Sequence, residues 1–93
     1  MYVRVVTVHV QPGKMDEFLR RLRELVLAPK VRRGFHGARF LTDAQTGTVL
    51  GVTEWETEAD AKAASVAGAE GGPLRDLLTA PAVVAYYELS LRV

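Results

Sequence analysis

The 93-residue chain has no cysteine, no long hydrophobic run and almost no excess of charge of either sign. The absence of cysteine excludes disulfides, thiolate nucleophiles and cysteine-ligated metals, and it favours a cytoplasmic location. No apolar stretch approaches the ~20 residues of a membrane span. The 12 basic and 11 acidic residues leave a net charge of +1, which is no electrostatic footprint for nucleic acid or an anionic membrane. We therefore expect neither as a partner.

What is present is the composition of one small globular domain, residues 1–93, with 48% hydrophobic and 25% charged residues. A chain of this size buries only roughly 60–65% of the surface that its unfolded form exposes, so its core is thin. Small domains often enlarge such a core by oligomerising. We therefore expect an oligomer rather than an isolated monomer.

The first half of the chain reads as strand, helix, strand, strand. β-branched residues over 2–10 predict a strand, and "QPGK" ends it. A helix follows and ends before Pro29; its apolar stripe is Met15, Phe18, Leu19, Leu22, Leu25 and Val26. Residues 35–42 and 48–55 predict two strands, joined by the hairpin loop "DAQTG" with Gly47 in the left-handed conformation.

The second half adds helix and strand. "TEAD" begins a helix over 58–67, because the Thr57 hydroxyl can cap a free N–H. Pro73 suits the first position of a short helix over 73–78, and residues 82–93 predict a last strand. The order β-α-β-β-α-β is typical of an α+β, ferredoxin-like domain, whose four-stranded antiparallel sheet carries both helices on one face. The other face needs a partner, so we expect a homodimer joined through the sheet face.

Three motifs carry a family resemblance. They are "V-x-V-x-P-G-K-x-D-E-F-L" at 8–19, "R-G-F-x-G" at 33–37 and "E-W-E-T-E-A-D-A" at 54–61. In this order and spacing they resemble the antibiotic biosynthesis monooxygenase (ABM) superfamily, the dimeric α/β-barrel group. The resemblance covers essentially the whole chain and implies a ligand cavity between sheet and helices. It does not choose among the functions that the superfamily hosts.

One branch of that superfamily consists of cofactor-independent oxygenases of polycyclic phenols. Its pattern is an Asn four residues before a Trp, a Tyr six residues after it and an Arg about twenty residues after it. Here Trp55 and Arg75 match the Trp and the Arg, whereas Gly51 and Ala61 replace the Asn and the Tyr. The resemblance implies that Trp55 walls the cavity and that Arg75 holds a phenolate or carboxylate oxygen.

A second branch degrades haem with an Asn on the first strand, the same Trp and a His in the second helix. Val6 stands at that Asn position, and residues 58–67 contain no histidine. Both departures argue against haem degradation, and we expect no cofactor. Strand alternation places His9 and His36 on the face away from the cavity, and two lone histidines make no metal site.

Alternation along the strands also predicts which other side chains share the cavity with Trp55. Gly51 and Thr53 lie on its side of the strand. Tyr86 and Tyr87 face opposite ways, so one meets the cavity and the other the dimer interface. The expected lining residues are Val6, Val8, Phe18, Leu22, Phe35, Gly51, Thr53, Ala61 and Tyr86.

Several of these interpretations have alternatives. A symmetric hairpin that pairs Thr42 with Thr48 sets Phe35 opposite Trp55, whose ring can be a packing plug, a cavity wall or both. Arg75 can equally be a surface arginine. The basic connector "KVRRG" could attract an anionic ligand or could simply be hydrated.

The leading functional interpretation is a homodimeric, cofactor-free monooxygenase that oxidises a small phenolic, quinol-like or polyketide-like compound. A deprotonated phenol is electron-rich enough to react with O2 without a metal. One rival is a non-catalytic ligand-binding protein on the same scaffold, favoured by the small residues Gly51, Ala61 and Ala64. Another is an isomerase or cyclase, which adds no oxygen. Whether the chain is an enzyme stays open at this point.

Overall fold

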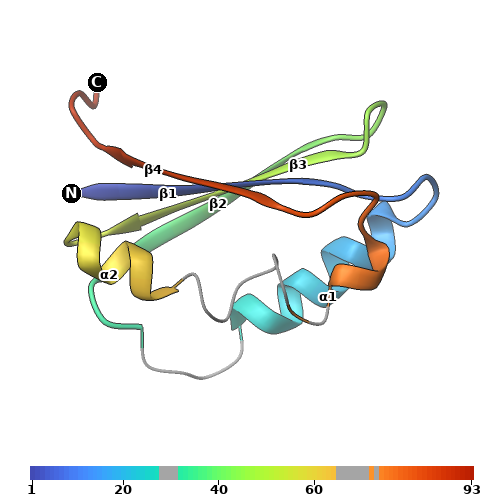
Figure 1. Ribbon diagram of the computed structural model, residues 1–93, viewed down its shortest axis with the longest axis horizontal. Coiled ribbons are helices and arrows are strands. Elements are labelled where there is room, and N and C mark those ends of the chain that lie inside the picture. The colour runs from blue at the N-terminus through green and yellow to red at the C-terminus, as the bar shows by residue number, and fades with distance from the viewer. Residues whose placement is uncertain (28–31, 65–71, 73) are drawn as a thin grey trace.

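A computed structural model describes residues 1–27, 32–64, 72 and 74–93. Its elements are β1 (Tyr2–His9), α1 (Met15–Leu27), β2 (Phe35–Asp43), β3 (Thr48–Trp55), α2 (Glu58–Ala63), the 3-10 turn η2 (Arg75–Leu77) and β4 (Val83–Glu88). The strands form one antiparallel sheet in the order β2-β3-β1-β4. Both helices lie on the same side of this sheet (Figure 1), which confirms the ferredoxin-like α+β fold.

Some boundaries differ from the sequence-based expectation. β4 ends at Glu88 instead of running on to the last residue, and the expected short helix is only the single turn η2. Val10 does not extend β1 but forms an isolated bridge with Leu78, which ties the end of β1 to the segment after η2. Residues 65–67 of the expected second helix lie outside the described residues, as does most of "GAEGG". No helix in the described part of the chain is long and apolar enough to cross a membrane.

Local chemistry explains where the helices and turns form. α1 buries Phe18 and Leu22 on its apolar stripe. Thr57 caps α2, because its hydroxyl oxygen accepts a hydrogen bond from the Asp60 backbone N–H at 3.1 Å. Gly47 has φ +75°, as expected, and an added Cβ would lie 2.6 Å from the Val10 carbonyl oxygen. The tight turn before β3 therefore requires glycine.

The β2–β3 hairpin differs from the expected register at one end and agrees with it at the other. Thr48 pairs with Asp43, not with Thr42, so the expectation of a symmetric hairpin was wrong by one residue. A β-bulge between Phe35 and Gly37 then shifts the register back. Phe35 therefore lies opposite Trp55, which confirms that expected pair. The pairing results from the bulge, which strict alternation along the strand does not predict.

The core lies between the sheet and the helices. It includes Val6, Val8 and Val10 of the first strand region, Phe18 and Leu22 of α1, Val49, and Leu74 and Leu77 around η2. Arg21 of α1 ties η2 to the helix through an ion pair with Asp76 at 3.1 Å. The hydrogen bond with Glu17, and then the charge of Asp76, raise the pKa of Arg21 above its ordinary value, so it stays charged at any physiological pH.

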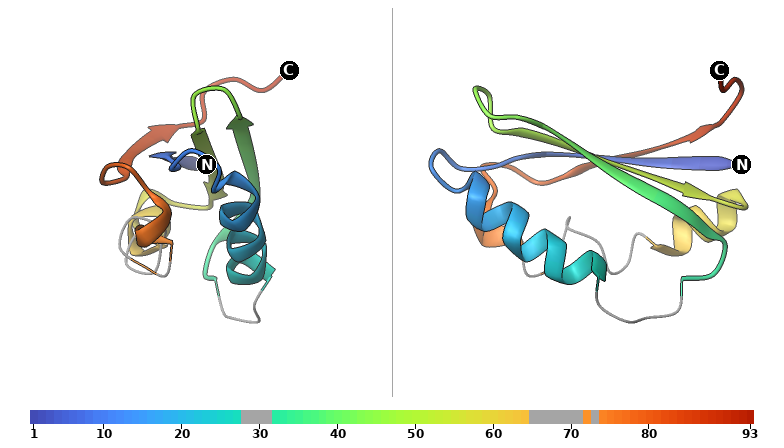
Figure 2. Two further views of the ribbon diagram at one scale, coloured as in Figure 1. Left: turned by 90° about the vertical axis from the view of Figure 1, so that its right-hand side faces the viewer. Right: turned by 180° about the vertical axis from the view of Figure 1, so that it is seen from behind.

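No element among the described residues covers the sheet face opposite the helices (Figure 2). The register aligns Leu41, Leu50, Thr7 and Val83 in one row across the four strands. Leu41 is 52% exposed and Val83 64% exposed, and Tyr87 on the same face is 58% exposed. Large apolar side chains so exposed on one continuous surface are typical of a face that packs against something else.

Candidate functional site

A cavity of about 800 Å³ lies between the sheet and α1. β1 and β3 contribute every second residue to its wall, because alternate side chains of a strand point to the same face, and the β2 bulge shifts this spacing after Phe35. Its lining from the strands is Arg4, Val6 and Val8 of β1, Phe35, Ala38 and Phe40 of β2, and Val49, Gly51, Thr53 and Trp55 of β3. Its other lining residues are Phe18, Leu22, Leu25, Val26 and Leu27 of α1, and Arg32, Arg33, Asp60, Ala63, Ala64 and Leu74.

Trp55 forms the wall at one end of the cavity and is only 6% exposed. Its indole N–H donates a hydrogen bond to the Thr53 hydroxyl oxygen at 2.8 Å. The Phe35 ring meets the indole edge to face, with ring centroids 5.2 Å apart and an interplanar angle of 62°. Trp55 therefore both packs against its neighbours and forms part of the cavity wall. Because its N–H already donates to Thr53, it offers a ligand only its ring surface.

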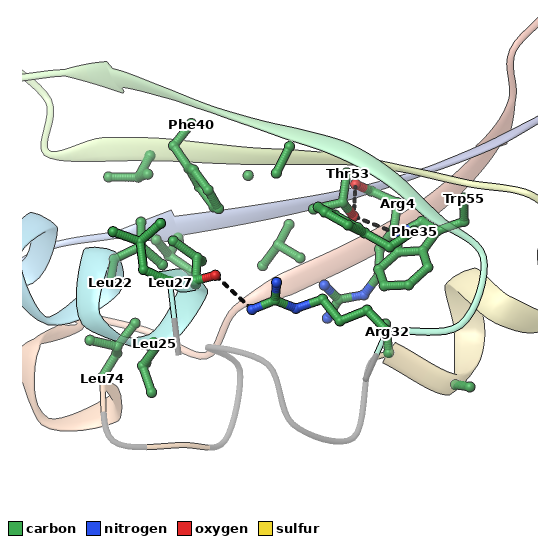
Figure 3. A pocket seen from close by; sticks show the side chains of 18 of the residues that line it. Arg4, Leu22, Leu25, Leu27, Arg32, Phe35, Phe40, Thr53, Trp55 and Leu74 are labelled. Carbon is green, nitrogen blue, oxygen red and sulfur yellow. Dashed lines mark hydrogen bonds between the residues drawn. The ribbon is translucent and has the colours of Figure 1, made fainter. Parts of the chain in front are cut away.

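Two arginines enter the same end of the cavity. Arg4 comes from β1 and is only 6% exposed, and Arg32 comes from the loop before β2 (Figure 3). Arg32 donates from Nη2 to the Val26 carbonyl oxygen at 2.6 Å, near the end of α1. Its guanidinium carbon also lies 5.4 Å from the centroid of the Phe35 ring, within the range of a cation–π contact. These contacts hold the Arg32 side chain across the cavity.

The rim near α2 carries one negative and one further positive charge. The Asp60 carboxylate lies 4.0 Å from Arg33 Nε, and the two side chains are 18% and 93% exposed. Solvent screens this pair strongly at the Arg33 side. With Arg4 and Arg32, the charged lining residues of the described chain are three guanidiniums and one carboxylate. Among the described lining residues, guanidiniums therefore outnumber carboxylates.

Although Gly51 has no side chain, it leaves little open space in the cavity wall. A Cβ at this position would lie 3.2 Å from Phe40 Cε1 and 3.3 Å from Cδ1. The Phe40 ring of the neighbouring strand thus covers the place where the oxygenase pattern has an amide side chain. The wall at Gly51 is apolar, and the polar groups of the cavity lie toward Trp55 instead.

The structure brings together most of the predicted site residues but not all. Trp55 lines the cavity with the predicted residues Val6, Val8, Phe18, Leu22, Phe35, Gly51 and Thr53. Ala61 is fully buried in α2 without lining the cavity. Tyr86 lies on the cavity side of β4 opposite Arg4, where its ring is 5.8 Å from Lys62 Nζ, but it does not line the cavity either. Tyr87 faces the uncovered side.

Arg75 is the predicted residue whose position departs furthest from expectation. It lies in η2 and lines a separate, smaller recess with Leu78, Thr79, Ala80 and Pro81. The reason is the direction of the turn, because Leu74 and Leu77 are buried and leave Arg75 exposed between them. The cavity arginines are instead Arg4 and Arg32. Arg4 could have been found from the sequence, because it alternates with Val6 and Val8 on one face of β1.

The histidines lie away from the cavity. His36 Nε2 is 2.5 Å from Glu56 Oε2 at the surface, and His9 Nδ1 is 3.3 Å from the Thr48 hydroxyl oxygen. No cluster of three or more metal-ligating side chains occurs among the residues that the structure describes. The described lining offers none of the side chains that commonly ligate haem iron, namely His, Cys, Met or Tyr. These residues therefore do not fit a haem held through its iron.

Solved structures with the same fold include proteins with different ligands. The haem-degrading protein MhuD of Mycobacterium tuberculosis, solved with two haems in its active site, has a TM-score of 0.77 at 22% identity over 100% of this chain and 99% of that one. A monooxygenase of Streptomyces coelicolor, solved in complex with nanaomycin D, has a TM-score of 0.67 at 20% identity over 99% and 89%. Identities this low show the fold alone. A comparison with curated protein sequences gave no match.

The family follows from a sequence model rather than from these superpositions. The model of the family described as antibiotic biosynthesis monooxygenase matches residues 1–67 of this chain. A putative member from Nitrosomonas europaea has a TM-score of 0.72 at 20% identity over 95% of this chain and 97% of that one. The match covers β1 through α2, the elements that build most of the cavity. The chain belongs to the antibiotic biosynthesis monooxygenase family.

Proposed function

We propose that this protein oxidises a small phenolic or quinol-like aromatic compound with O2 in the cavity beside Trp55, without a cofactor. The observation that carries the proposal is Arg4, a residue that is 6% exposed and lines the cavity beside the aromatic side chains of Trp55 and Phe35. A cationic group in a low-dielectric site favours the deprotonated form of a bound phenol or enol. That anion is the species that can donate electrons to O2.

The reaction balances without a further reductant. In an anthrone, a ring methylene flanked by two aryl groups loses two hydrogens and gains one oxygen atom from O2, and the other oxygen atom leaves as water. A hydroquinone instead gives two electrons and two protons to O2, which leaves as hydrogen peroxide, and the quinone gains no oxygen atom. The protein's part is to hold the aromatic rings against Trp55 and Phe35, to stabilise the anion through Arg4 and to exclude bulk water with the apolar wall. In this proposal Arg4 takes the role that the family resemblance gave to Arg75.

Oxygen uptake with an anthrone or a hydroquinone as substrate tests the proposal. The purified protein should consume one O2 per quinone formed, and product mass with labelled O2 should show one added labelled oxygen atom for an anthrone. Arg4→Met should lower kcat/KM by about 10-fold or more, because it removes one charge-assisted contact to the anion. Arg20→Met, on the exposed side of α1, is the matched control. Uptake at the uncatalysed rate across both substrate types would refute the oxygenase.

The second candidate function is non-catalytic ligand binding. Asp60 is the one carboxylate among the described lining residues, neither histidine lines the cavity, and proton transfer therefore has few carriers. A ligand that stays bound through purification and is recovered unchanged after exposure to air would favour this candidate. An isomerase or cyclase would yield a product of unchanged mass.

We also propose that two copies pair through the uncovered sheet face. The accessible surface of the chain is 6199 Å², against about 5,300 Å² expected for a compact monomer of this mass. The apolar row through Leu41, Leu50 and Val83 provides the contact surface. Light scattering at micromolar concentration should give twice the chain mass, and Leu50→Glu should halve it. A wild-type monomer mass under these conditions would contradict the proposal.

A further inference from the structure

Two guanidinium groups line the cavity beside its aromatic wall. We define the arginine end as Arg4 and Arg32, the guanidiniums that enter the cavity from the sheet and from the loop before β2 (Figure 3). The one acidic residue among the described lining residues, Asp60, has its carboxylate 4.0 Å from Arg33 Nε at the rim. Among the described lining residues the positive charge therefore exceeds the negative charge.

The Arg4 and Arg32 side chains lie near the same aromatic pair, Trp55 and Phe35 (Figure 3). The Thr53 hydroxyl donates to the Arg4 carbonyl oxygen at 3.4 Å and accepts from Trp55 at 2.8 Å. The Trp55 ring packs on Phe35, and the Arg32 guanidinium carbon lies 5.4 Å from the Phe35 centroid. An aromatic ligand beside Trp55 and Phe35 would thus have guanidinium groups near its edge.

A hydrogen bond between a guanidinium and an anion is charge-assisted, and it is stronger in a low-dielectric cavity than in water. A guanidinium carries five N–H donors in a planar fork that matches the two oxygens of a carboxylate. The contact with Val26 takes one donor of Arg32. A carboxylate is also ionised at any physiological pH, so its binding does not depend on deprotonation in the site.

We infer that the arginine end binds the carboxylate of an aromatic acid, so that the ligand of this cavity is an aromatic carboxylic acid rather than a neutral polycycle. The inference rests on the proposed function only in taking the cavity as the ligand site. It requires no turnover, so binding alone can test it.

The test compares two probes of nearly the same shape, anthraquinone-2-carboxylic acid and anthraquinone-2-carboxamide. Neither probe is a substrate for the proposed oxidation. Titration calorimetry gives both dissociation constants, and quenching of the single tryptophan reports whether the rings lie beside Trp55. The acid should bind wild-type protein about 10- to 100-fold more tightly than the amide, the range for a charge-assisted guanidinium contact. Added salt should narrow this ratio.

Two variants assign the preference to its residues. Arg4→Met and Arg32→Met keep an unbranched side chain and remove the charge, so each should lower the acid-to-amide ratio by about 10-fold. The affinity for the amide should stay within about 3-fold, because the aromatic wall is intact. Arg20→Met, on the exposed side of α1, should leave both constants unchanged. If Arg4→Met fails to fold, Arg32→Met and the wild-type comparison still decide the question.

Three results would overturn the inference. They are an acid-to-amide ratio below about 3 in wild-type protein, an equal loss of affinity for both probes in the arginine variants, and tighter binding of the matching aryl phosphate than of the acid. Acid selectivity without oxygen uptake from any phenol would leave the inference standing and remove the oxygenase. Oxidation of neutral phenols with no preference for acids would support the oxygenase and overturn the inference of a carboxylate site.

Discussion

The hydrogen bond between Trp55 and Thr53 gives a prediction whose size follows from the structure. The indole N–H and the Thr53 hydroxyl oxygen are 2.8 Å apart, and Trp55 is 6% exposed. Thr53→Val keeps the shape of the side chain and removes the acceptor, which leaves a buried N–H without this partner. Such a group costs about 1–3 kcal/mol. At about 2 kcal/mol, the melting temperature of a domain of this length falls by about 8–16 °C.

A double-mutant cycle isolates this bond from the loss of the hydroxyl itself. In the Trp55→Phe background there is no indole N–H to leave unsatisfied, so Thr53→Val should cost less than about 0.5 kcal/mol there. Urea unfolding followed by circular dichroism measures all four proteins at one concentration, because pairing of chains would make stability depend on it. Thr42→Val on the exposed part of β2 is the matched control and should change stability by less than about 0.5 kcal/mol.

The outcome that contradicts this account is a Thr53→Val effect of the same size in both backgrounds. The hydroxyl would then act through its longer, 3.4 Å contact with the Arg4 carbonyl oxygen and not through the indole. A neutral Thr53→Val would show that the N–H finds another acceptor. In either case Trp55 would not be fixed in the orientation that turns its ring surface, rather than its N–H, to a ligand.

Three further predictions concern the turn before β2, the α2 cap and the recess at η2. Gly34→Ala should destabilise the protein by about 2 kcal/mol, because Gly34 has φ +74° and an added Cβ would lie 2.2 Å from the Asp60 carboxylate; Gly13→Ala, with φ +78° and open space, should cost only about 1 kcal/mol. Thr57→Ala should cost about 1 kcal/mol in urea unfolding, and Thr57→Asp should restore most of it. Arg75→Met should change the affinity for the carboxylic acid probe by less than about 2-fold in calorimetry, since Arg75 does not line the cavity.

The fold was predictable because each of its signals is local. Period-two and period-3.6 patterns, Gly47 in a tight turn and the Thr57 cap each depend on a few neighbouring residues. The register of the β2–β3 hairpin could not be predicted in this way, because the bulge between Phe35 and Gly37 depends on how the whole strand pair fits the core. That Phe35 still meets Trp55 results from two departures from the symmetric hairpin that cancel.

The candidate site was less predictable than the fold. The family resemblance pointed to Arg75 as an anion-holding arginine, with a surface arginine as the alternative, and Arg75 lies exposed between the buried Leu74 and Leu77, outside the cavity lining. Arg4 was missed although it alternates with Val6 and Val8, because a charged residue at the end of an apolar strand is usually solvated. Which arginine enters a cavity depends on tertiary packing, and spacing along the chain does not encode it.

The wall around Gly51 links these observations to the chemistry. The oxygenase pattern places an amide on β3, where it could direct a substrate oxygen from the sheet. Here the Phe40 ring lies within 3.2 Å of where a Cβ of residue 51 would be, so that part of the wall can only exclude water. Polar recognition must then come from the Arg4 and Arg32 side of the cavity, at the opposite end of the β3 wall from Val49. A substrate with its charged edge near Trp55 and its apolar rings toward Phe40 places each part against side chains of matching polarity. The reverse orientation would bury the charge against Phe40 without a partner.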